Sequence, residues 1–381
     1  MRGDLVWLTA SLGLRGLSFG LYLMLWPLYV EHLGGGPVAL GSLAAVGGAV
    51  SALVLLPGGW LADRWDRRQL AIAAGLLAAP APLLFAWAPS WRWLIPGMVL
   101  FHAAQFARPA LQAIVAEAAP PNVMASRYGV VMSAFEAGMA VGPPVGAWMA
   151  EAAHGFGPVF VAAAVLSGLA VLALLPLRPH PQRARGALRP SRPRPWHRPA
   201  LRRWIGFMAV FATVQSLAFP FAVPYWRGVG GLGLETLGWI GSVGIAAATV
   251  AGPLWGWLAE RIGFIRALGW GLGFTAVGWA LVAGFPRHVG VALLAATLRG
   301  AEEGCGTVAG AAIGRTVPPE DAGTAYGWFN WVAEVGRAVG PVPGGLLYRW
   351  WPTAPFLLTA AITAALAFAF LDTLPPVWRQ P

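Results

Sequence analysis

The chain has 381 residues, of which 57% are hydrophobic and only 11% are charged, and its formal net charge is +11 at pH 7. A soluble protein carries roughly 25% charged residues, so this composition excludes an ordinary soluble globule and indicates that much of the chain lies in lipid. The single cysteine, Cys305, and the absence of lysine exclude an internal disulfide, a cysteine-based metal cluster and a lysine-containing phosphate loop, so we expect no enzyme activity, cofactor or metal site.

Twelve apolar segments follow one another, each close to the ~20 residues that cross a bilayer as a helix. In chain order they are Leu5–Val30, Val38–Ala62, Gln69–Ala88, Trp93–Glu117, Ser126–Ala150, Phe156–Leu177, Arg203–Trp226, Glu235–Ala259, Ile265–Phe285, His288–Ala312, Thr324–Tyr348 and Thr353–Thr373. They predict an all-α membrane protein with twelve transmembrane helices.

A segment rich in arginine and proline separates the sixth span from the seventh. Residues 178–203 contain nine arginines, six prolines and no acidic residue, which predicts an extended linker. Because short arginine-rich loops stay in the cytoplasm, the linker predicts a multi-pass protein of the cell inner (plasma) membrane with both termini cytoplasmic. We attribute the positive charge to this topology and to anionic lipid headgroups, and expect no nucleic-acid partner.

Two stretches of the chain occur twice. "GWLADRWDRR" begins at Gly59 and "GWLAERIGFI" at Gly256; "PPNVMASRYGVVMSAFEAGMAVGPPVGAWM" begins at Pro120 and "PPEDAGTAYGWFNWVAEVGRAVGPVPGGLL" at Pro318. The repetition predicts two parallel, pseudo-symmetric six-helix halves, residues 1–177 and 203–381, joined by a cytoplasmic linker at 178–202. Such halves enclose a central cavity in secondary transporters.

These motifs resemble those of the major facilitator superfamily over nearly the whole chain. The residues that match its loop signature, or correspond to it in the second copy, are Gly59, Asp63, Arg64, Arg67, Arg68, Gly256, Glu260 and Arg261. Asp66 stands where the signature has its second glycine. A second signature, typical of the proton-coupled drug exporters (antiporters) of the family, matches Gly129, Gly138, Gly142, Pro143 and Gly146, and again Gly336, Gly340, Pro341 and Gly344.

The resemblance implies a secondary active transporter that works by alternating access. It implies a cytoplasmic latch at Gly59, Asp63, Arg64, Arg67, Arg68, Glu260 and Arg261, and hinges at Gly138, Gly142, Pro143, Gly146, Gly336, Gly340, Pro341 and Gly344. The residues alone leave two simpler interpretations open. The arginines may serve only to set the topology, and the glycines only to let helices pack closely. The family's arginine motif of the fourth span is missing, since Phe101 and His102 occupy that region.

Eight charged residues lie inside predicted spans: Arg15, Arg108, Arg299, Arg337, Glu136, Glu302, Glu303 and Glu334. Each costs about 2.5–3.5 kcal/mol on insertion scales, so each is expected to pair or to face water. Their depths predict two ion pairs, Arg108 with Glu136, and Arg337 with Glu302 or Glu303. These pairs either hold helices together or change partners during transport.

The four glutamates are the proton-coupling candidates. Glu334 is the first choice, because Glu302 and Glu303 are expected to compete with it for Arg337 and to leave it free to bind a proton; Glu136, Glu302 and Glu303 are the others. His102 is interpreted mainly as a core or cavity histidine.

Aromatic and amide side chains are expected to complete the substrate cavity, because rings offer broad apolar contact to varied ligands. The candidates are Tyr22, Trp26, Phe211, Gln215, Phe219, Phe329, Asn330 and Trp331. The same residues are also suited to packing or to facing lipid.

The sequence therefore favours proton-coupled efflux of hydrophobic or amphiphilic small molecules by a monomer. One alternative is a facilitator or exporter of anionic, sugar-like or lipid solutes. An alternative of another class is a non-transporting membrane receptor or assembly factor on the same fold.

Overall fold

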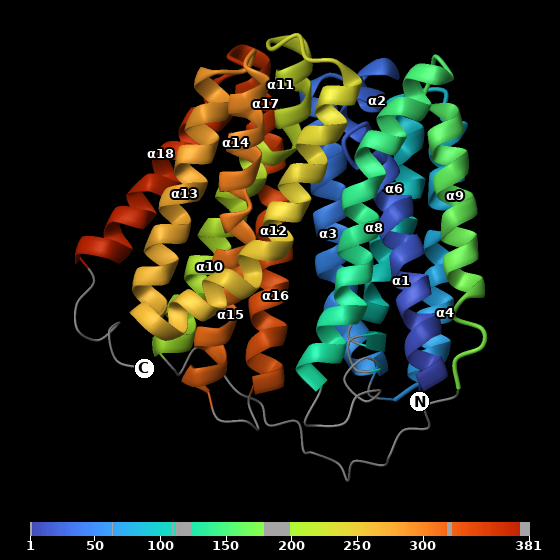
Figure 1. Ribbon diagram of the computed structural model, residues 1–381, viewed down its shortest axis with the longest axis horizontal. Coiled ribbons are helices and arrows are strands. Elements are labelled where there is room, and N and C mark those ends of the chain that lie inside the picture. The colour runs from blue at the N-terminus through green and yellow to red at the C-terminus, as the bar shows by residue number, and fades with distance from the viewer. Residues whose placement is uncertain are drawn as a thin grey trace. The chain divides into compact units, whose positions relative to one another are not determined.

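The structure is a computed structural model that describes the backbone of residues 2–62, 64–108, 110–111, 114, 124–178, 199–317 and 322–373, and side chains within these ranges (Figure 1). Asp63 of the predicted latch and nearly all of the predicted linker lie outside the described residues. Contacts divide the chain into two compact units: Met1–Gly186 with Gly233–Ser242 form unit 1, and Ala187–Leu232 with Val243–Pro381 form unit 2.

All regular structure in the described ranges is helical. The helices in unit 1 are α1 (Arg2–Leu23), α2 (Trp26–His32), α3 (Pro37–Ala62), α4 (Arg67–Ala78), α5 (Ala81–Ala86), η1 (Trp91–Trp93), α6 (Leu94–Ala103), η2 (Ala104–Ala107), α8 (Met124–Ala152) and α9 (Gly157–Leu172). Those in unit 2 are α10 (Pro199–Ala218), η5 (Phe219–Phe221), α11 (Ala222–Gly228), α13 (Phe264–Gly284), α14 (Val289–Arg299), α15 (Ala301–Thr316), α16 (Ala322–Val339), α17 (Pro341–Trp350), α18 (Ala354–Phe368) and η6 (Ala369–Thr373). Helix α12 (Leu234–Ile262) begins in unit 1 and continues in unit 2.

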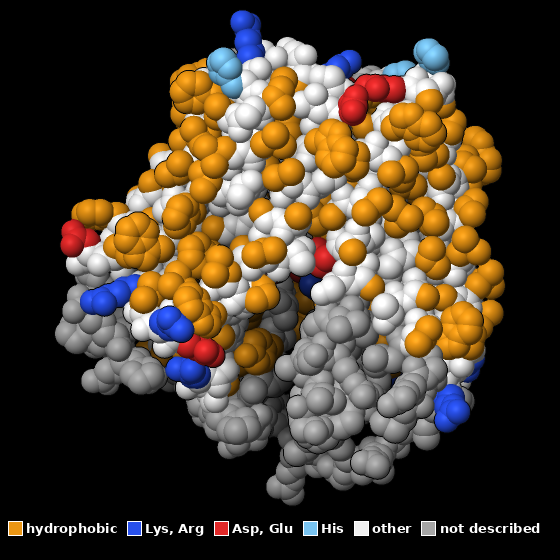
Figure 2. All heavy atoms as spheres, viewed as in Figure 1, with side chains coloured by type: hydrophobic (Ala, Val, Ile, Leu, Met, Phe, Trp, Pro, Cys, Tyr) orange, Lys and Arg blue, Asp and Glu red, His pale blue; other side chains and the backbone are white. Residues whose placement is uncertain are grey.

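These helices follow the twelve predicted spans in order. Spans one to six correspond to α1 with α2, α3, α4 with α5, α6 with η2, α8, and α9; spans seven to twelve correspond to α10 with α11, α12, α13, α14 with α15, α16 with α17, and α18 with η6. Six described segments are long and apolar enough to cross a membrane, and the pair α1 and α2, bent by 45°, makes a seventh. Hydrophobic side chains cover the flanks of the helices in the view of Figure 2, while most charged side chains lie near the helix ends.

Several spans are broken, and the breaks have local chemical causes. Proline removes a backbone donor and crowds the preceding turn, and glycine weakens the helix. Pro80 separates α4 from α5, Pro220 lies in η5 between α10 and α11, and Pro341 begins α17 directly after α16. Gly300 separates α14 from α15. Pro143, the counterpart of Pro341, stays inside the continuous α8.

The predicted hinge glycines lie where helices touch. In unit 1, α1 packs along α8 (Figure 1), and a Cβ added at Gly138, Gly142 or Gly146 would come closer than 3.0 Å to backbone atoms of α1. In unit 2, α10 packs along α16 and α17, and Gly336, Gly340 and Gly344 meet the backbone of α10 in the same way. Small residues let membrane helices approach closely, so these glycines have a packing role; their role as hinges stays a prediction.

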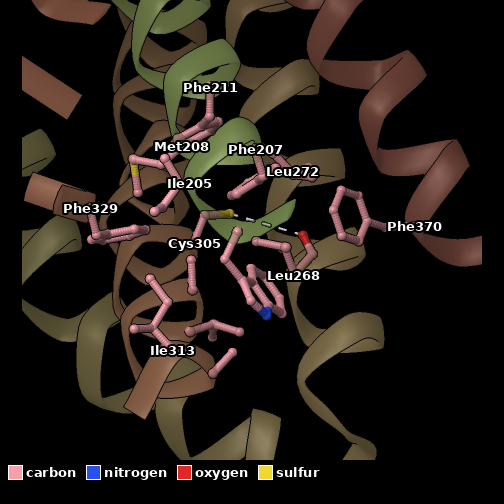
Figure 3. Packing of buried hydrophobic residues seen from close by; sticks show 14 of the residues in the cluster. Ile205, Phe207, Met208, Phe211, Leu268, Leu272, Cys305, Ile313, Phe329 and Phe370 are labelled. Carbon is pink, nitrogen blue, oxygen red and sulfur yellow. Dashed lines mark hydrogen bonds between the residues drawn. The ribbon is translucent and has the colours of Figure 1, made fainter. Parts of the chain in front are cut away.

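The main core of unit 2 surrounds Cys305. Phe207, Phe211, Leu268 and Phe329 pack around this thiol (Figure 3). Phe211 and Phe329, predicted to line a substrate cavity, are only 4% and 6% exposed and belong to this core. For these two residues the packing alternative holds in this structure.

Candidate functional site

The loop between α3 and α4 holds most residues of the predicted latch in unit 1. The carboxylate of Asp66 accepts hydrogen bonds from the backbone N–H groups of Arg68 and Gln69 at 2.8 and 3.2 Å. Asp66 therefore caps α4, which explains an aspartate where the family signature has glycine. Arg68 donates to the carbonyl of Leu175, at the end of the sixth span, at 2.5 Å.

We expect Asp66→Ala to lower the free energy of unfolding by about 1 kcal/mol, because it removes the acceptor for two N–H groups of the first turn of α4. Thermal unfolding of the purified protein measures the change. Gln69→Ala is the matched control, since the cap bond uses only its backbone. Equal stability of the two variants would contradict the capping role.

Both copies of the repeated stretch place an arginine over a tryptophan four residues earlier. The guanidinium carbon of Arg64 lies 4.0 Å from the ring centroid of Trp60, and that of Arg261 lies 4.1 Å from Trp257. Such stacking stabilises an exposed pair by about 0.5–1 kcal/mol. It gives the two latch arginines the same local geometry, but the latch itself stays a prediction.

The charged and polar side chains inside unit 1 are dispersed. Arg15 on α1 is half-buried and interacts electrostatically with Tyr22 one helical stretch further on. Arg108 and Glu136 both have interaction partners, and the predicted pairing between them stays a prediction. On α6, His102 lies with Nδ1 2.9 Å from Ser51 Oγ of α3, as a core histidine would.

The aromatic candidates of unit 1 pack against each other. Tyr22 is 5% exposed and lies 5.6 Å, centroid to centroid, from Phe160 of α9. The Trp26 ring lies 4.6 Å from Phe85 of α5. This aromatic cluster holds α1, α2, α5 and α9 together, so packing accounts for both residues.

A polar network in unit 2 crosses four spans. The Trp279 indole N–H on α13 donates to Gln215 Oε1 on α10 at 2.7 Å, and Gln215 Nε2 donates to Thr363 Oγ1 on α18 at 3.2 Å. The guanidinium of Arg299, at the end of α14, lies 3.7 Å from the Trp279 ring centroid and 5.6 Å from that of Phe219. Trp279 is fully buried, whereas Phe219 is 51% exposed. The network fixes the indole on which Arg299 stacks.

The acidic residues of unit 2 have different partners from those predicted. Arg337 Nη1 lies 3.2 Å from Glu334 Oε1, one turn away on the same helix α16. The predicted ion pair of Arg337 with Glu302 or Glu303 is therefore wrong among the described residues. Glu302 lies instead between the charges of Arg299, Glu303 and Arg337, and it accepts no hydrogen bond from the part of the chain that the structure describes.

The remaining candidates lie near this cluster in the sequence. Asn330 is exposed, and Trp331 packs edge-on against Trp328 at 5.5 Å. Trp279 and Thr363 were not among the predicted site residues. A signal for Trp279 existed, because a buried indole N–H needs an acceptor, and Gln215 is an amide in an otherwise apolar part of the seventh span.

Comparison with known proteins agrees with this arrangement. The profile described as Major Facilitator Superfamily matches residues 8–237 and 204–381. The quinolone resistance protein NorA of Staphylococcus aureus is 27% identical over 140 residues, and the multi-drug resistance efflux pump PmrA of Streptococcus pneumoniae is 30% identical over 142 residues. Each of these matches covers 36% of this chain and 36% of the relative's own length.

Solved structures share the fold across almost the whole chain. The nucleoside transporter NupG superposes with a TM-score of 0.81 at 14% identity, covering 97% of this chain and all (100%) of the other. A peptide transporter, POT, in complex with sulfate superposes with a TM-score of 0.79 at 16% identity, covering 98% and 95%. At these identities the likeness concerns the fold alone.

Proposed function

This chain belongs to the Major Facilitator Superfamily, and we propose that it exports hydrophobic or amphiphilic small molecules in exchange for protons. It is a membrane transporter and not an enzyme. The matching segments of two multidrug efflux pumps support export of such compounds, and the charge arrangement in unit 2 supports proton coupling.

Glu302 is the observation that carries the coupling proposal. Burial in a span disfavours a charged carboxylate, while the nearby charges of Arg299 and Arg337 favour it. A group under such opposed influences changes its protonation when a neighbour moves or a ligand arrives. No hydrogen bond from the described residues fixes Glu302 in its charged form.

We therefore place the proton on Glu302 rather than on Glu334. The hydrogen bond from Arg337 favours the charged form of Glu334. Glu334 keeps Arg337 occupied, and so limits the positive charge available to Glu302. Glu136 and Glu303 are the remaining candidates.

The transport cycle is proposed to move the halves 1–177 and 203–381 about the linker at 178–202. The hinges and the cytoplasmic latch named from the sequence belong to this proposal, as do an inner-membrane location with both termini cytoplasmic and a monomeric state.

Proton-coupled export predicts flux in proteoliposomes under an imposed pH gradient. With ethidium as the probe, we expect the gradient to drive its accumulation, and ethidium to stimulate proton movement in return. A fluorescent pH indicator inside the vesicles reports the second effect. Ethidium flux that is insensitive to the gradient would point to a facilitator, and a complete absence of flux with any amphiphile would favour a receptor or assembly factor.

A further inference from the structure

We propose that the tenth span binds a zwitterionic amphiphile, with its acidic group on Arg299 and its amine on Glu302. This rests on the proposed export of amphiphiles and narrows the substrate class. The two side chains carry opposite charges three residues apart, and neither hydrogen-bonds to the other or to any residue in the described ranges. The following features show why they stay apart.

Arg299 is held away from Glu302 by aromatic stacking. Its guanidinium lies 3.7 Å from the centroid of Trp279, and the indole is fixed in turn by its bond to Gln215. Gly278 makes room for the arginine stem, since a Cβ added there would lie 2.7 Å from Arg299 Cγ. The arginine therefore has its position set by α13 rather than by the carboxylate on its own span.

The break at Gly300 separates the two charges further. Helix α14 ends at Arg299 and α15 begins at Ala301, so the side chains of Arg299 and Glu302 belong to different helices. A Cβ at Gly300 would come within 2.8 Å of Ala247 on α12. Discontinuous helices are typical of binding sites in membrane transporters, because they present polar groups inside the membrane.

Both charged groups have unused hydrogen-bonding capacity. Arg299 Nε is enclosed without a partner in the described part of the chain, and a guanidinium has five donors to satisfy. The side chains of Arg299 and Glu302 are each only partly buried, so a ligand can reach them. The exposed Phe219 ring, 5.6 Å from the guanidinium, supplies an apolar contact beside the charges.

A zwitterion completes this arrangement. Its carboxylate accepts from the guanidinium, and its ammonium donates to the Glu302 carboxylate, with the apolar body against Phe219. Arg337 and Glu334 do not compete, because they bond to each other; Glu303 adds negative charge that favours the ammonium. The amine and a proton then exclude one another at Glu302, which is the competition that antiport requires.

A matched series of three fluorescent probes tests the assignment by binding alone. Nε-dansyl-lysine is the zwitterion, its methyl ester is the cation, and its Nα-acetyl derivative is the anion. Energy transfer from tryptophan to dansyl on the purified protein in lipid nanodiscs reports the affinity. A charge-assisted hydrogen bond contributes about 1.5–3 kcal/mol, so we expect the zwitterion to bind roughly tenfold or more tightly than either derivative.

Two variants assign each charge. Arg299→Gln is expected to reduce zwitterion binding to the level of the ester, and Glu302→Gln to reduce it to the level of the acetyl derivative. Arg266→Gln, at an exposed arginine of the same unit, is the matched control and should keep the wild-type order. If Arg299→Gln fails to fold, Gly278→Ala displaces the arginine without removing its charge and should also abolish the preference for the zwitterion.

Equal binding of the three probes by the wild-type protein, or equal loss of all three in Arg299→Gln, would overturn the assignment. The outcome is separable from proton coupling. Gradient-driven ethidium flux without zwitterion preference refutes only this site, and zwitterion preference without gradient-driven flux refutes only the coupling.

Discussion

Glu302→Gln is expected to abolish gradient-driven transport while the protein still folds and binds neutral amphiphiles. The amide resembles the protonated carboxyl and cannot release a proton, so the cycle loses its coupled step. We expect transport under a pH gradient to fall at least a hundredfold, to the level of empty vesicles, and ligand affinity to become independent of pH. Proteoliposome flux and equilibrium binding across pH 5–8 measure the two effects.

Two further variants give this result its meaning. Glu151→Gln, at an exposed position at the end of α8, should transport normally. Glu334→Gln should release Arg337 and change the pH dependence without removing it, because the carboxyl that binds the proton is still present. Wild-type pH dependence in Glu302→Gln, with its loss in Glu334→Gln, would return the proton to Glu334.

Gly146→Ala is expected to destabilise the protein by more than about 3 kcal/mol. The added Cβ would overlap the backbone of α1 at Leu21, and backbone atoms have no alternative rotamer that would relieve the overlap. Gly344→Ala should have the same effect in unit 2, where the obstacle is the backbone at Leu217. Unfolding of the purified protein by heat or by denaturing detergent measures the loss.

Gly168→Ala provides the opposite expectation. No atom lies within 4 Å of a Cβ added on α9 at this position, so alanine should leave stability unchanged or raise it by up to about 1 kcal/mol. If Gly146→Ala were as stable as the wild type but failed to transport, the glycine would act as a hinge and not as a packing residue.

Hydrophobic length and internal repetition predicted the elements of the fold. Runs of about 20 apolar residues require helices because lipid offers no hydrogen bonds to an open backbone, and the matching helices appear in the expected order. The sequence also marked Gly146 and Gly344 correctly as special positions, since only glycine allows so close a helix contact. The breaks at Pro220 and Gly300 followed from the same local chemistry.

The partners of the site residues were harder to predict. Depth along a span places Glu302 and Arg337 at one level, yet Arg337 bonds to Glu334, which is one turn away on its own helix. Rotation about the helix axis decided whether Phe211 and Phe329 faced a cavity or the core, and an apolar stretch without a strong polar face carries little information about rotation. The stacking of Arg299 on Trp279 depends on contact between two spans, which no spacing within one span reveals.

The pairing of Arg337 with Glu334 on a single helix bears on how transport responds to membrane voltage. A single charge that crosses 100 mV exchanges about 2.3 kcal/mol with the field. The two paired charges are opposite and travel together on α16, so a displacement of this helix along the membrane normal leaves their combined electrical work close to zero. The membrane potential then acts on the cycle through the proton and the net charge of the cargo, and a zwitterion adds none. At zero pH gradient, voltage alone should therefore drive such a cargo through the exchanged proton.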